Sequence, residues 1–424
     1  MSILYSIINF GPLWLAKGEV QRNFSSQSDI VNSKSDVHQP SKLTELAKIN
    51  PFRVMTVMQR ATELEAEGNK IVHMEVGEPD FSTARPIIDE AKRALDSGFT
   101  HYTAAVGIDE LRRALADHYL ERYGVSVDKE RILVTPGASG GLSLLANLLV
   151  GQDDGVLITD PSYPCVRNFI HLMNASPQLV PVDRTQNFQP SVQQLENFAD
   201  DRTCGVWLAS PGNPTGSILD REALTSICSW CSDKELHLLI DEIYHGLHYV
   251  DDLPSVLEVD DSAFVVNSFS KYFGMTGWRL GWIVVPDYAV DKAKILAQNL
   301  YISPSSVAQY AALAGFSEEA RIILEQRRES FRERRDFLCA SLQEIGFIVA
   351  EEVQGAFYVY ADISRFSENS GQFCHDMLES HGVAITPGTD FGDFRAEQFV
   401  RFAFTTGMDN LALGVERLRR ALHE

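Results

Sequence analysis

The sequence predicts an α/β fold in which a large domain has a mostly parallel sheet between helices, beside a smaller α+β domain. Apolar strand patterns alternate with helical patterns from residue 131 to residue 268, which is typical of parallel strands joined by right-handed crossovers. The chain has 424 residues, more than one simple core accommodates. Its 45% hydrophobic and 22% charged residues are the proportions of a globular protein.

Charge and cysteine content exclude several classes of partner. The 58 Asp and Glu residues outnumber the 37 Lys and Arg residues, and the formal net charge is -21. Such a charge repels phosphate backbones and anionic membranes, so we expect neither nucleic acid nor a membrane as a partner. The six cysteines follow no disulfide framework, which indicates the cytoplasm. Cys228 and Cys231 form a CxxC in a helical pattern, where packing is favoured over a metal site.

Residues 1–40 do not match the rest of the chain. Residues 3–16 are apolar but too short to cross a bilayer, and no positive residue precedes them as a secretory signal requires. Residues 25–40 are polar and are predicted to be disordered. We expect an N-terminal extension without catalytic residues rather than a targeting peptide.

The remaining chain is predicted to form three parts. They are an N-terminal arm with part of the small domain (41–95), the large domain (96–316) and the C-terminal small domain (317–424). The arm contains a helix at 56–68 and a strand at 71–76, and the C-terminal part begins with a charged helix at 318–342. The arginines at 327–335 are expected on a solvated face with internal ion pairs.

The ends of the predicted parallel strands indicate where a ligand binds. Six strands are expected in the large domain, at 131–135, 155–160, 178–182, 205–209, 236–241 and 263–268. In open parallel sheets, ligands bind beyond the carboxyl ends of the strands. The segments that follow these strands should therefore carry the site.

The most informative of these segments is NSFSKYFGMTGWRLGW, residues 267–282. Lys271 follows a buried strand and has apolar neighbours, and desolvation favours the neutral amine that forms a Schiff base with an aldehyde. Ser268, Ser270 and Arg279 can hold a phosphate dianion beside it. An aldehyde that carries a phosphate points to pyridoxal 5′-phosphate (PLP). The alternative is an ordinary surface lysine near a loop.

The other strand ends supply complementary groups. Backbone amides of Ala138 and Ser139, in a glycine-rich loop that opens a helix, suit a phosphate. Tyr163 follows the second strand and can stack on a flat ring, and Asn213 lies in a rigid Pro- and Gly-rich turn as a fixed amide donor. Either could also serve only its own turn.

The end of the fifth predicted strand carries a carboxylate and a hydroxyl group. Asp241 closes a strongly apolar strand and needs a cationic partner if it is buried, and a pyridinium nitrogen is one. The alternative for Asp241 is a helix cap. Tyr244 can donate to the phenolate of such a ring, whereas His245 and His248 are interpreted as local packing. In chain order the strand ends supply all the groups that one PLP needs.

Two positions outside the sheet suit a substrate. Arg401 lies between apolar β-type residues, where a cation is costly to bury unless an anion such as a carboxylate meets it. Gly77 precedes Pro79 in a tight turn in which the backbone can approach a ligand closely.

The segments 210–216, 241–244 and 268–282 resemble the signature segments of class I/II aminotransferases, PLP enzymes of fold type I, and most of all the bacterial aspartate/aromatic branch. The resemblance runs from about residue 71 to the C-terminus and implies a seven-stranded type of sheet. It implies that Lys271 carries PLP, that Asp241 pairs with the pyridine nitrogen, and that Tyr163 stacks on the ring. It further implies that Asn213 and Tyr244 bind the ring oxygen and that the phosphate is held by Ala138, Ser139, Ser268, Ser270 and Arg279.

The same resemblance assigns substrate and subunit contacts. Arg401 would bind the substrate α-carboxylate, with Gly77 and Asn213 beside it, and Phe357 would line the pocket. Tyr102 would reach the phosphate in the other subunit of a homodimer with shared active sites. Some relatives that use acidic substrates carry a lysine at the position of Ser139, so the chain departs from the aspartate pattern there. The hypothesis is a substrate with an apolar or aromatic side chain.

The implied activity is transfer of an amino group from an L-amino acid to a 2-oxo acid by a ping-pong mechanism, with Lys271 as general base and acid. A carbon–sulfur β-lyase or another PLP enzyme on the same scaffold is the alternative, because these reactions differ only in pocket detail. A ligand sensor fused to a DNA-binding module is a third class. It would need a basic N-terminal domain, and residues 1–40 are short and not basic.

Overall fold

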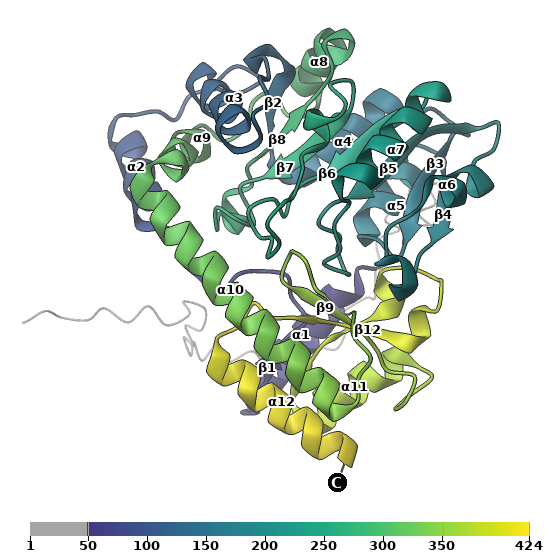
Figure 1. Ribbon diagram of the computed structural model, residues 1–424. Coiled ribbons are helices and arrows are strands. Elements are labelled where there is room, and N and C mark those ends of the chain that lie inside the picture. The colour runs from purple at the N-terminus through teal and green to yellow at the C-terminus, as the bar shows by residue number, and fades with distance from the viewer. Residues whose placement is uncertain (1–48, 50, 351, 424) are drawn as a thin grey trace, which may run out of the picture. The chain divides into compact units, whose positions relative to one another are not determined.

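A seven-stranded sheet forms the centre of the larger part of the structure, a computed structural model that describes residues 49, 51–350 and 352–423 (Figure 1). β8 is antiparallel to both of its neighbours, and all other neighbouring strands are parallel. The predicted α/β class with a mostly parallel sheet is confirmed. The expectations for residues 1–40 lie outside the described residues. In spatial order the strands are β2 (Ile132–Thr135), β8 (Gly281–Val284), β7 (Phe264–Ser268), β6 (His237–Asp241), β5 (Thr203–Ala209), β3 (Gly155–Asp160) and β4 (Ser176–Pro181).

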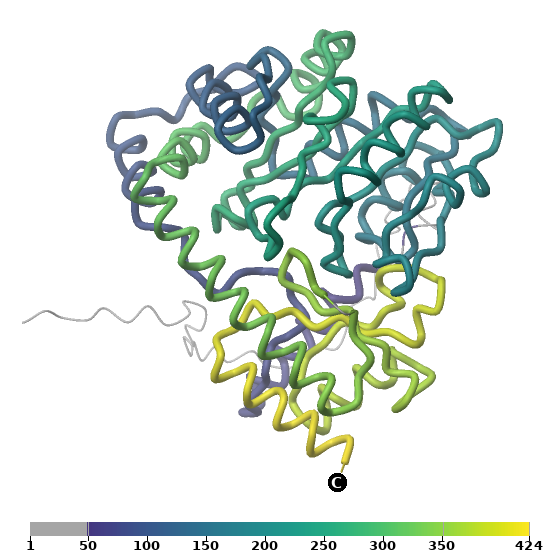
Figure 2. Tube along the Cα trace, viewed as in Figure 1, coloured from purple at the N-terminus to yellow at the C-terminus, as the bar shows by residue number. Residues whose placement is uncertain are grey.

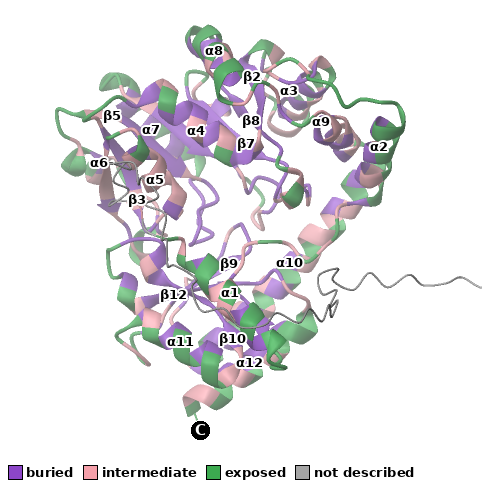
Figure 3. Cartoon of the chain, turned by 180° about the vertical axis from the view of Figure 1, so that it is seen from behind, coloured by how far each residue is buried: buried purple, intermediate pink, exposed green. Residues whose placement is uncertain are grey.

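Both faces of this sheet are buried (Figure 3). On β6 and β7 the side chains alternate between two hydrophobic clusters, so that Leu239 and Val266 belong to one and Ile240 and Val265 to the other. Strands that are covered on both faces read as continuous apolar runs, which is why the sequence shows them clearly. One cluster includes residues of α4 (Gly137–Leu149), α5 (Pro164–Leu172) and α8 (Val290–Leu300); the other includes residues of α3 (Asp109–Tyr123), α7 (Arg221–Asp233) and α9 (Ser306–Leu313).

Local sequence explains where several helices begin. The Asp220 side chain accepts from the backbone N–H of Ala223 and caps α7. Ser191 and Gln194 form a capping box at the start of α6 (Val192–Phe198). Such caps satisfy N–H groups that have no partner within the helix. Cys228 and Cys231 are both buried in α7, within the core.

The second part of the structure combines the two ends of the described chain (Figure 2). β1 (Val72–His73) pairs in parallel with β10 (Val383–Ala384), and β9 (Tyr358–Asp362), β12 (Phe399–Ala403) and β11 (Thr386–Pro387) form an antiparallel sheet. The strand predicted at 71–76 is therefore much shorter than expected. The helices of this part are α1 (Arg53–Ala66), α11 (Ser370–His381), α12 (Met408–His423) and the long α10 (Glu318–Ile345), and α2 (Arg85–Asp96) packs against α9.

The arginines of α10 differ from the expected solvated face. Arg332 does form an ion pair with Glu329 one turn earlier, with Nη2 2.5 Å from Oε1. Arg334, however, is buried, donates to Asp80 at 2.8 Å and lies over the Phe81 ring. This helix therefore packs against the segment that follows β1, because its arginines cover aromatic rings with their planar guanidinium groups.

None of the helices in the described residues combines the length and the apolarity that are needed to span a bilayer.

Candidate active site

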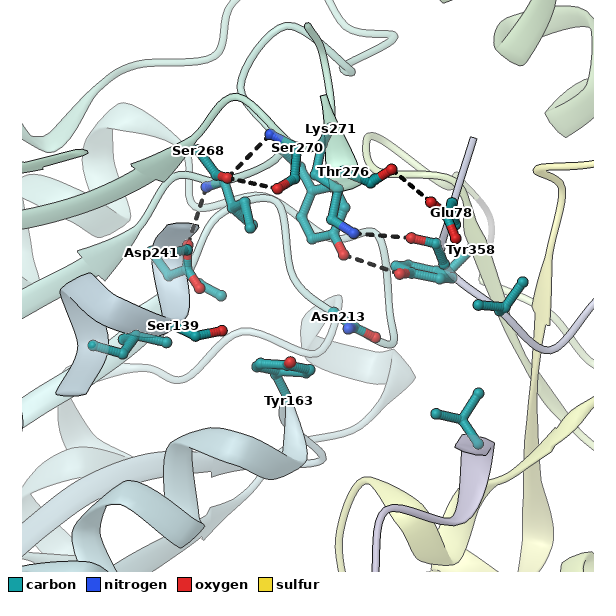
Figure 4. A pocket seen from close by; sticks show the side chains of 18 of the residues that line it. Glu78, Ser139, Tyr163, Asn213, Asp241, Ser268, Ser270, Lys271, Thr276 and Tyr358 are labelled. Atoms are coloured by element: carbon teal, nitrogen blue, oxygen red, sulfur yellow. Dashed lines mark hydrogen bonds between the residues drawn. The ribbon is translucent and has the colours of Figure 1, made fainter. Parts of the chain in front are cut away.

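A cavity of about 370 Å³ lies beyond the carboxyl ends of the parallel strands, where residues of the second part of the structure close it. Figure 4 shows its side chains: Lys271 and Tyr163 lie on opposite sides, Asp241 and Ser139 lie at one end, and Asn213 and Tyr358 lie toward the other. The predicted residues that line it are Gly77, Ala138, Ser139, Tyr163, Asn213, Asp241, Tyr244, Ser268, Ser270, Lys271, Arg279 and Arg401.

Lys271 follows β7 and reaches across the cavity to donate from Nζ to the carbonyl oxygen of Gly77 at 2.8 Å (Figure 4). Burial lowers the pKa of its amine to about 8, although the carboxylate of Glu78 opposes this shift. Desolvation penalises the ammonium form, so the neutral, nucleophilic amine is readily available near neutral pH.

An anion cradle is present at the start of α4. Pro136 provides no side-chain cap there, so the first N–H groups of the helix have no partner within it. Gly137 has a φ of 72°, and a Cβ at this position would lie 2.6 Å from Nη2 of Arg279, so only glycine lets the guanidinium lie against the helix. The hydroxyl groups of Ser268 and Ser270 lie 2.9 Å apart nearby in the cavity wall. Among the described residues, no carboxylate forms an ion pair with Arg279.

Asp241 ends β6 as a buried carboxylate that faces the cavity. Its one hydrogen bond within the described residues comes from the backbone N–H of Ile243 at 3.1 Å, and no cation forms an ion pair with it there. Burial raises the pKa of Asp241 to about 7. A buried carboxylate is costly without a cationic partner, so the position suits a ligand that brings a positive charge.

The neighbouring Glu242 is different, because the protein satisfies it. It accepts from the Ser255 hydroxyl group at 2.9 Å and from the backbone N–H of Val256 at 2.8 Å, and it does not line the cavity. Burial raises its pKa to about 8.

His245 does not line the cavity. Its Nδ1 forms a hydrogen bond of 2.7 Å with the Tyr123 hydroxyl group. Within the described part of the chain, no cluster of His, Cys, Asp or Glu is arranged to hold a metal ion.

Arg401 lies on β12 with only 2% of its surface exposed. Its guanidinium lies 4.2 Å from the Tyr358 ring centroid and donates to Oδ1 of Asn213 at 3.0 Å and to the carbonyl oxygen of Glu75. Its Nε has no hydrogen-bond partner, and no carboxylate in the described residues forms an ion pair with it. A buried cation with an unused donor suits an anionic ligand, and a carboxylate matches the guanidinium geometry.

Two predicted residues lie elsewhere. Phe357 is fully buried behind the cavity, with its ring 5.6 Å from Nζ of Lys271, and the next residue, Tyr358, lines the cavity instead. Successive side chains of an extended segment point to opposite sides, so one step along the chain exchanges the wall for the core. Tyr102 is 82% exposed and does not line the cavity of its own chain, and the prediction for it concerns another subunit.

The sequence did not single out several cavity residues. Phe52, Val54 and Met55, at the start of α1, line the cavity, and Phe52 packs edge-on against the Tyr163 ring at 6.1 Å. Tyr358 donates to or accepts from the Tyr244 hydroxyl group at 3.0 Å. Apolar residues some 200 positions from Lys271 carry no local signal of a site; only their contacts in the folded chain reveal it.

Comparisons with known proteins identify the family of the chain. The family model for "aminotransferase class I and II" matches residues 69–418. A valine–pyruvate aminotransferase of Mycobacterium tuberculosis is 36% identical over 374 residues, covering 88% of this chain and 96% of the relative. A (5-formylfuran-3-yl)methyl phosphate transaminase of Methanocaldococcus jannaschii is 34% identical over 382 residues, covering 89% and 99%.

Solved structures agree as well. The crystal structure of an aminotransferase from Mycobacterium tuberculosis has a TM-score of 0.87 and 36% identity, and the match covers 90% of this chain and 99% of that one. The aspartate aminotransferase from Thermus thermophilus with maleate has a TM-score of 0.86 and 30% identity, covering 91% and 100%. The chain therefore belongs to the class I and II aminotransferase family and is an aminotransferase.

Proposed function

We propose that this aminotransferase holds PLP in the cavity beyond the strand ends and transfers an amino group from an L-amino acid to a 2-oxo acid there. The observation that carries the proposal is the grouping of a neutralisable amine, a buried carboxylate without a counter-ion and an anion cradle in one cavity. A pyridine ring that carries a phosphate and an aldehyde complements all three.

The residues fit that cofactor group by group. Asp241 would pair with the ring nitrogen, Asn213 and Tyr244 would bind the ring oxygen, and Tyr163 would lie against the ring. The start of α4 and Arg279 would hold the phosphate. The first N–H groups of α4 have no side-chain cap, and the Arg279 guanidinium lies against the same helix start. The phosphate set is Ala138, Ser139, Ser268, Ser270 and Arg279. When bound, the cofactor supplies an electron sink for the charge that develops at the substrate Cα.

The chain's own residues do the positioning and the proton transfer. Arg401 would bind the α-carboxylate through its unused Nε and its Nη atoms, next to Asn213 and the Gly77 backbone. Two-point binding holds the Cα–H bond in a reactive orientation, which contributes several orders of magnitude in rate. Lys271 would take the proton from Cα and return it, because a pKa near 8 lets one amine act as base and as acid.

We also propose a homodimer. Besides Tyr102, other exposed apolar side chains lie on its own segment and on the segment before α9, namely Phe99 at 37%, Leu300 at 45% and Ile302 at 57%. The two segments that bear them are joined by hydrogen bonds from Ser306 Oγ to the carbonyl oxygen of His101 at 2.5 Å and from Gln309 Nε2 to Thr103 Oγ1 at 3.0 Å. Contiguous exposed apolar residues favour an interface, and Tyr102 would then reach the phosphate in the other subunit.

The domain limits stay proposals. We assign 96–316 to a large domain and 317–424 with the arm at 41–95 to a small one. The support is that the seven-stranded sheet lies between Ile132 and Val284, whereas β1 pairs with β10.

Chemical trapping tests the cofactor assignment. The protein is loaded with PLP, treated with borohydride and digested, and the modified peptide is identified by mass spectrometry. We expect the label on Lys271 alone. A label on another lysine, or none, would refute the assignment.

A second measurement separates transamination from lyase chemistry. With an amino acid and no 2-oxo acid, an aminotransferase stops after one equivalent of 2-oxo acid per site. A β-lyase would continue to turn over and release ammonia. The relatives' names include aminotransferases of valine and of aspartate, so the names alone do not indicate the side chain that this chain accepts.

A further inference from the structure

The charged groups of the cavity are few. Within the described residues its lining has three cations, Lys271, Arg279 and Arg401, and two carboxylates, Glu78 and Asp241. In the proposed function, a phosphate dianion and an α-carboxylate bring three negative charges. Arg279 and Arg401 meet these groups and Lys271 acts as an amine, so no cation is left for a second carboxylate on the substrate.

The remaining wall is mostly apolar. Its apolar side chains are Phe52, Val54, Met55, Val76, Leu142, Ala209 and Ile243, and its other members besides Glu78 are Thr276, Gly277 and Tyr358. The one further carboxylate, Glu78, accepts a hydrogen bond from the Thr276 hydroxyl group at 2.5 Å and would repel an acidic side chain. An isolated carboxylate in such surroundings pays a desolvation cost that nothing here offsets.

The start of α1 is held firmly in this wall. Phe52 gives the helix no side-chain cap, and Asp390 replaces it by accepting from the backbone N–H of Arg53 at 2.9 Å and of Val54 at 3.3 Å. Val54 is buried, whereas Met55 is 49% exposed and lines the cavity. The helix start is thus a fixed apolar surface with one position, Met55, that tolerates a longer or charged side chain.

The segment proposed to enter the other subunit does not change this balance. Residues 94–111, which include Tyr102, contain no Lys or Arg. A cation for an acidic side chain is therefore missing from this source also.

We propose that the cavity selects L-amino acids with uncharged, apolar side chains and that the start of α1, with Met55, sets this selection. The inference rests on the proposed function and gives it a substrate class. Apolar side chains gain from burial against this wall at about 25 cal/mol per Å² of apolar surface, whereas an acidic side chain gains nothing comparable.

The test compares steady-state transamination by the PLP-loaded full chain, with one 2-oxo acid acceptor at a fixed concentration. We measure kcat/KM for L-valine, L-leucine, L-aspartate and L-glutamate from the 2-oxo acid released, in wild type, Met55→Lys and Met55→Gln. The wild type should favour the apolar substrates by about hundredfold or more. Met55→Lys should raise kcat/KM for the acidic substrates at least about tenfold by supplying a counter-ion, whereas Met55→Gln, of similar length without charge, should not.

Each outcome bears on one claim. A wild type that prefers aspartate or glutamate would overturn the selection, even though a borohydride-fixed adduct on Lys271 would leave the proposed function intact. An unchanged acidic-to-apolar ratio in Met55→Lys would overturn the role of α1. Absence of both the adduct and any amino acid turnover would instead refute the proposed function, and this inference with it.

Discussion

The two walls of the cavity differ in origin and in chemistry. The sheet wall, which we define as the cavity residues between Ala138 and Arg279, comes from successive strand ends and carries the amine, the carboxylate and the anion cradle. The second wall comes from residues 52–78 and from β9 and β12, near the two ends of the described chain. It carries mostly apolar side chains, one buried cation and the carboxylate of Glu78. In the proposed function, the reactive groups thus lie on the sheet wall, and the second wall supplies Arg401 for the substrate carboxylate.

Burial acts on both walls but with different results. On the sheet wall it lowers the pKa of Lys271 to about 8 and raises that of Asp241 to about 7, so both groups change charge near neutral pH. On the second wall it encloses Arg401, whose guanidinium forms no ion pair with a carboxylate of the described residues and has an Nε without a hydrogen-bond partner. One wall is therefore suited to proton transfer and the other to electrostatic binding.

The largest expected effect is on the sheet wall. Lys271→Ala should lower turnover by about 10³-fold or more for every substrate, because it removes the nucleophile and the general base together. Steady-state assays of PLP-loaded protein give the rate, and borohydride trapping should detect no adduct. Lys294→Ala, which replaces a half-buried lysine outside the cavity lining that is paired with Glu130 at 2.9 Å, is the control. Retained turnover in Lys271→Ala would show that another residue provides the reactive amine.

The second wall should show a binding effect. Arg401→Ala should lower kcat/KM by about hundredfold for all amino acids, mostly through KM, since losing one partner of a buried charge pair costs about 2–5 kcal/mol. Arg401→Lys should recover only part of it, because an ammonium does not bind two oxygens in a fork. Arg419→Ala, half exposed at the surface, is the control. A loss restricted to acidic amino acids would assign Arg401 to the side chain instead.

pH should act on the sheet wall alone. Capture of PLP by the apoprotein needs the neutral Lys271 amine, so its rate should rise about tenfold from pH 7 to pH 9 and then level off, given a pKa of about 8. Stopped-flow absorbance measures the rate. The rate at which a small-molecule amine of ordinary lysine pKa captures PLP should continue to rise above pH 9. A rate that rises about hundredfold from pH 7 to pH 9 without levelling off would show that burial does not shift the pKa of this amine.

The smallest effect concerns the link between the walls. Tyr358→Phe removes the hydroxyl contact of 3.0 Å with Tyr244. One hydrogen bond contributes about 1 kcal/mol, so kcat/KM should fall roughly fivefold and the stability slightly. Thermal unfolding and steady-state kinetics measure both. Tyr288→Phe, at a position 64% exposed, should change neither. An equal loss in Tyr288→Phe would show that the effect of Tyr358→Phe does not come from the contact with Tyr244.

Much of the fold was predictable because burial on both sides makes strands read as apolar runs. β3 was predicted with its observed bounds, and β6 and β7 to within one residue. β8 was missed, because it follows the lysine segment directly as an antiparallel strand with no α-helix between. β1 shrank to two residues, since its pairing with β10, more than 300 residues away, sets its length.

The same division holds for the site. The candidate residues that the sequence indicated at the strand ends, from Ala138 to Arg279, all line the cavity, because each follows a recognisable local pattern. Their assigned roles stay predictions. Phe357 was chosen where Tyr358 lines the cavity, since an error of one position in an extended segment changes the side.

The sequence by itself determined the type of sheet, the strand ends and the reactive side chains, because these follow from short-range apolar patterns. Only the tertiary structure decided that Phe52, Val54 and Met55 complete the cavity and that Arg401 stays unpaired within the described residues. The physical reason is that these features depend on contacts between distant segments, in which packing and the local balance of charge are properties of the assembled chain.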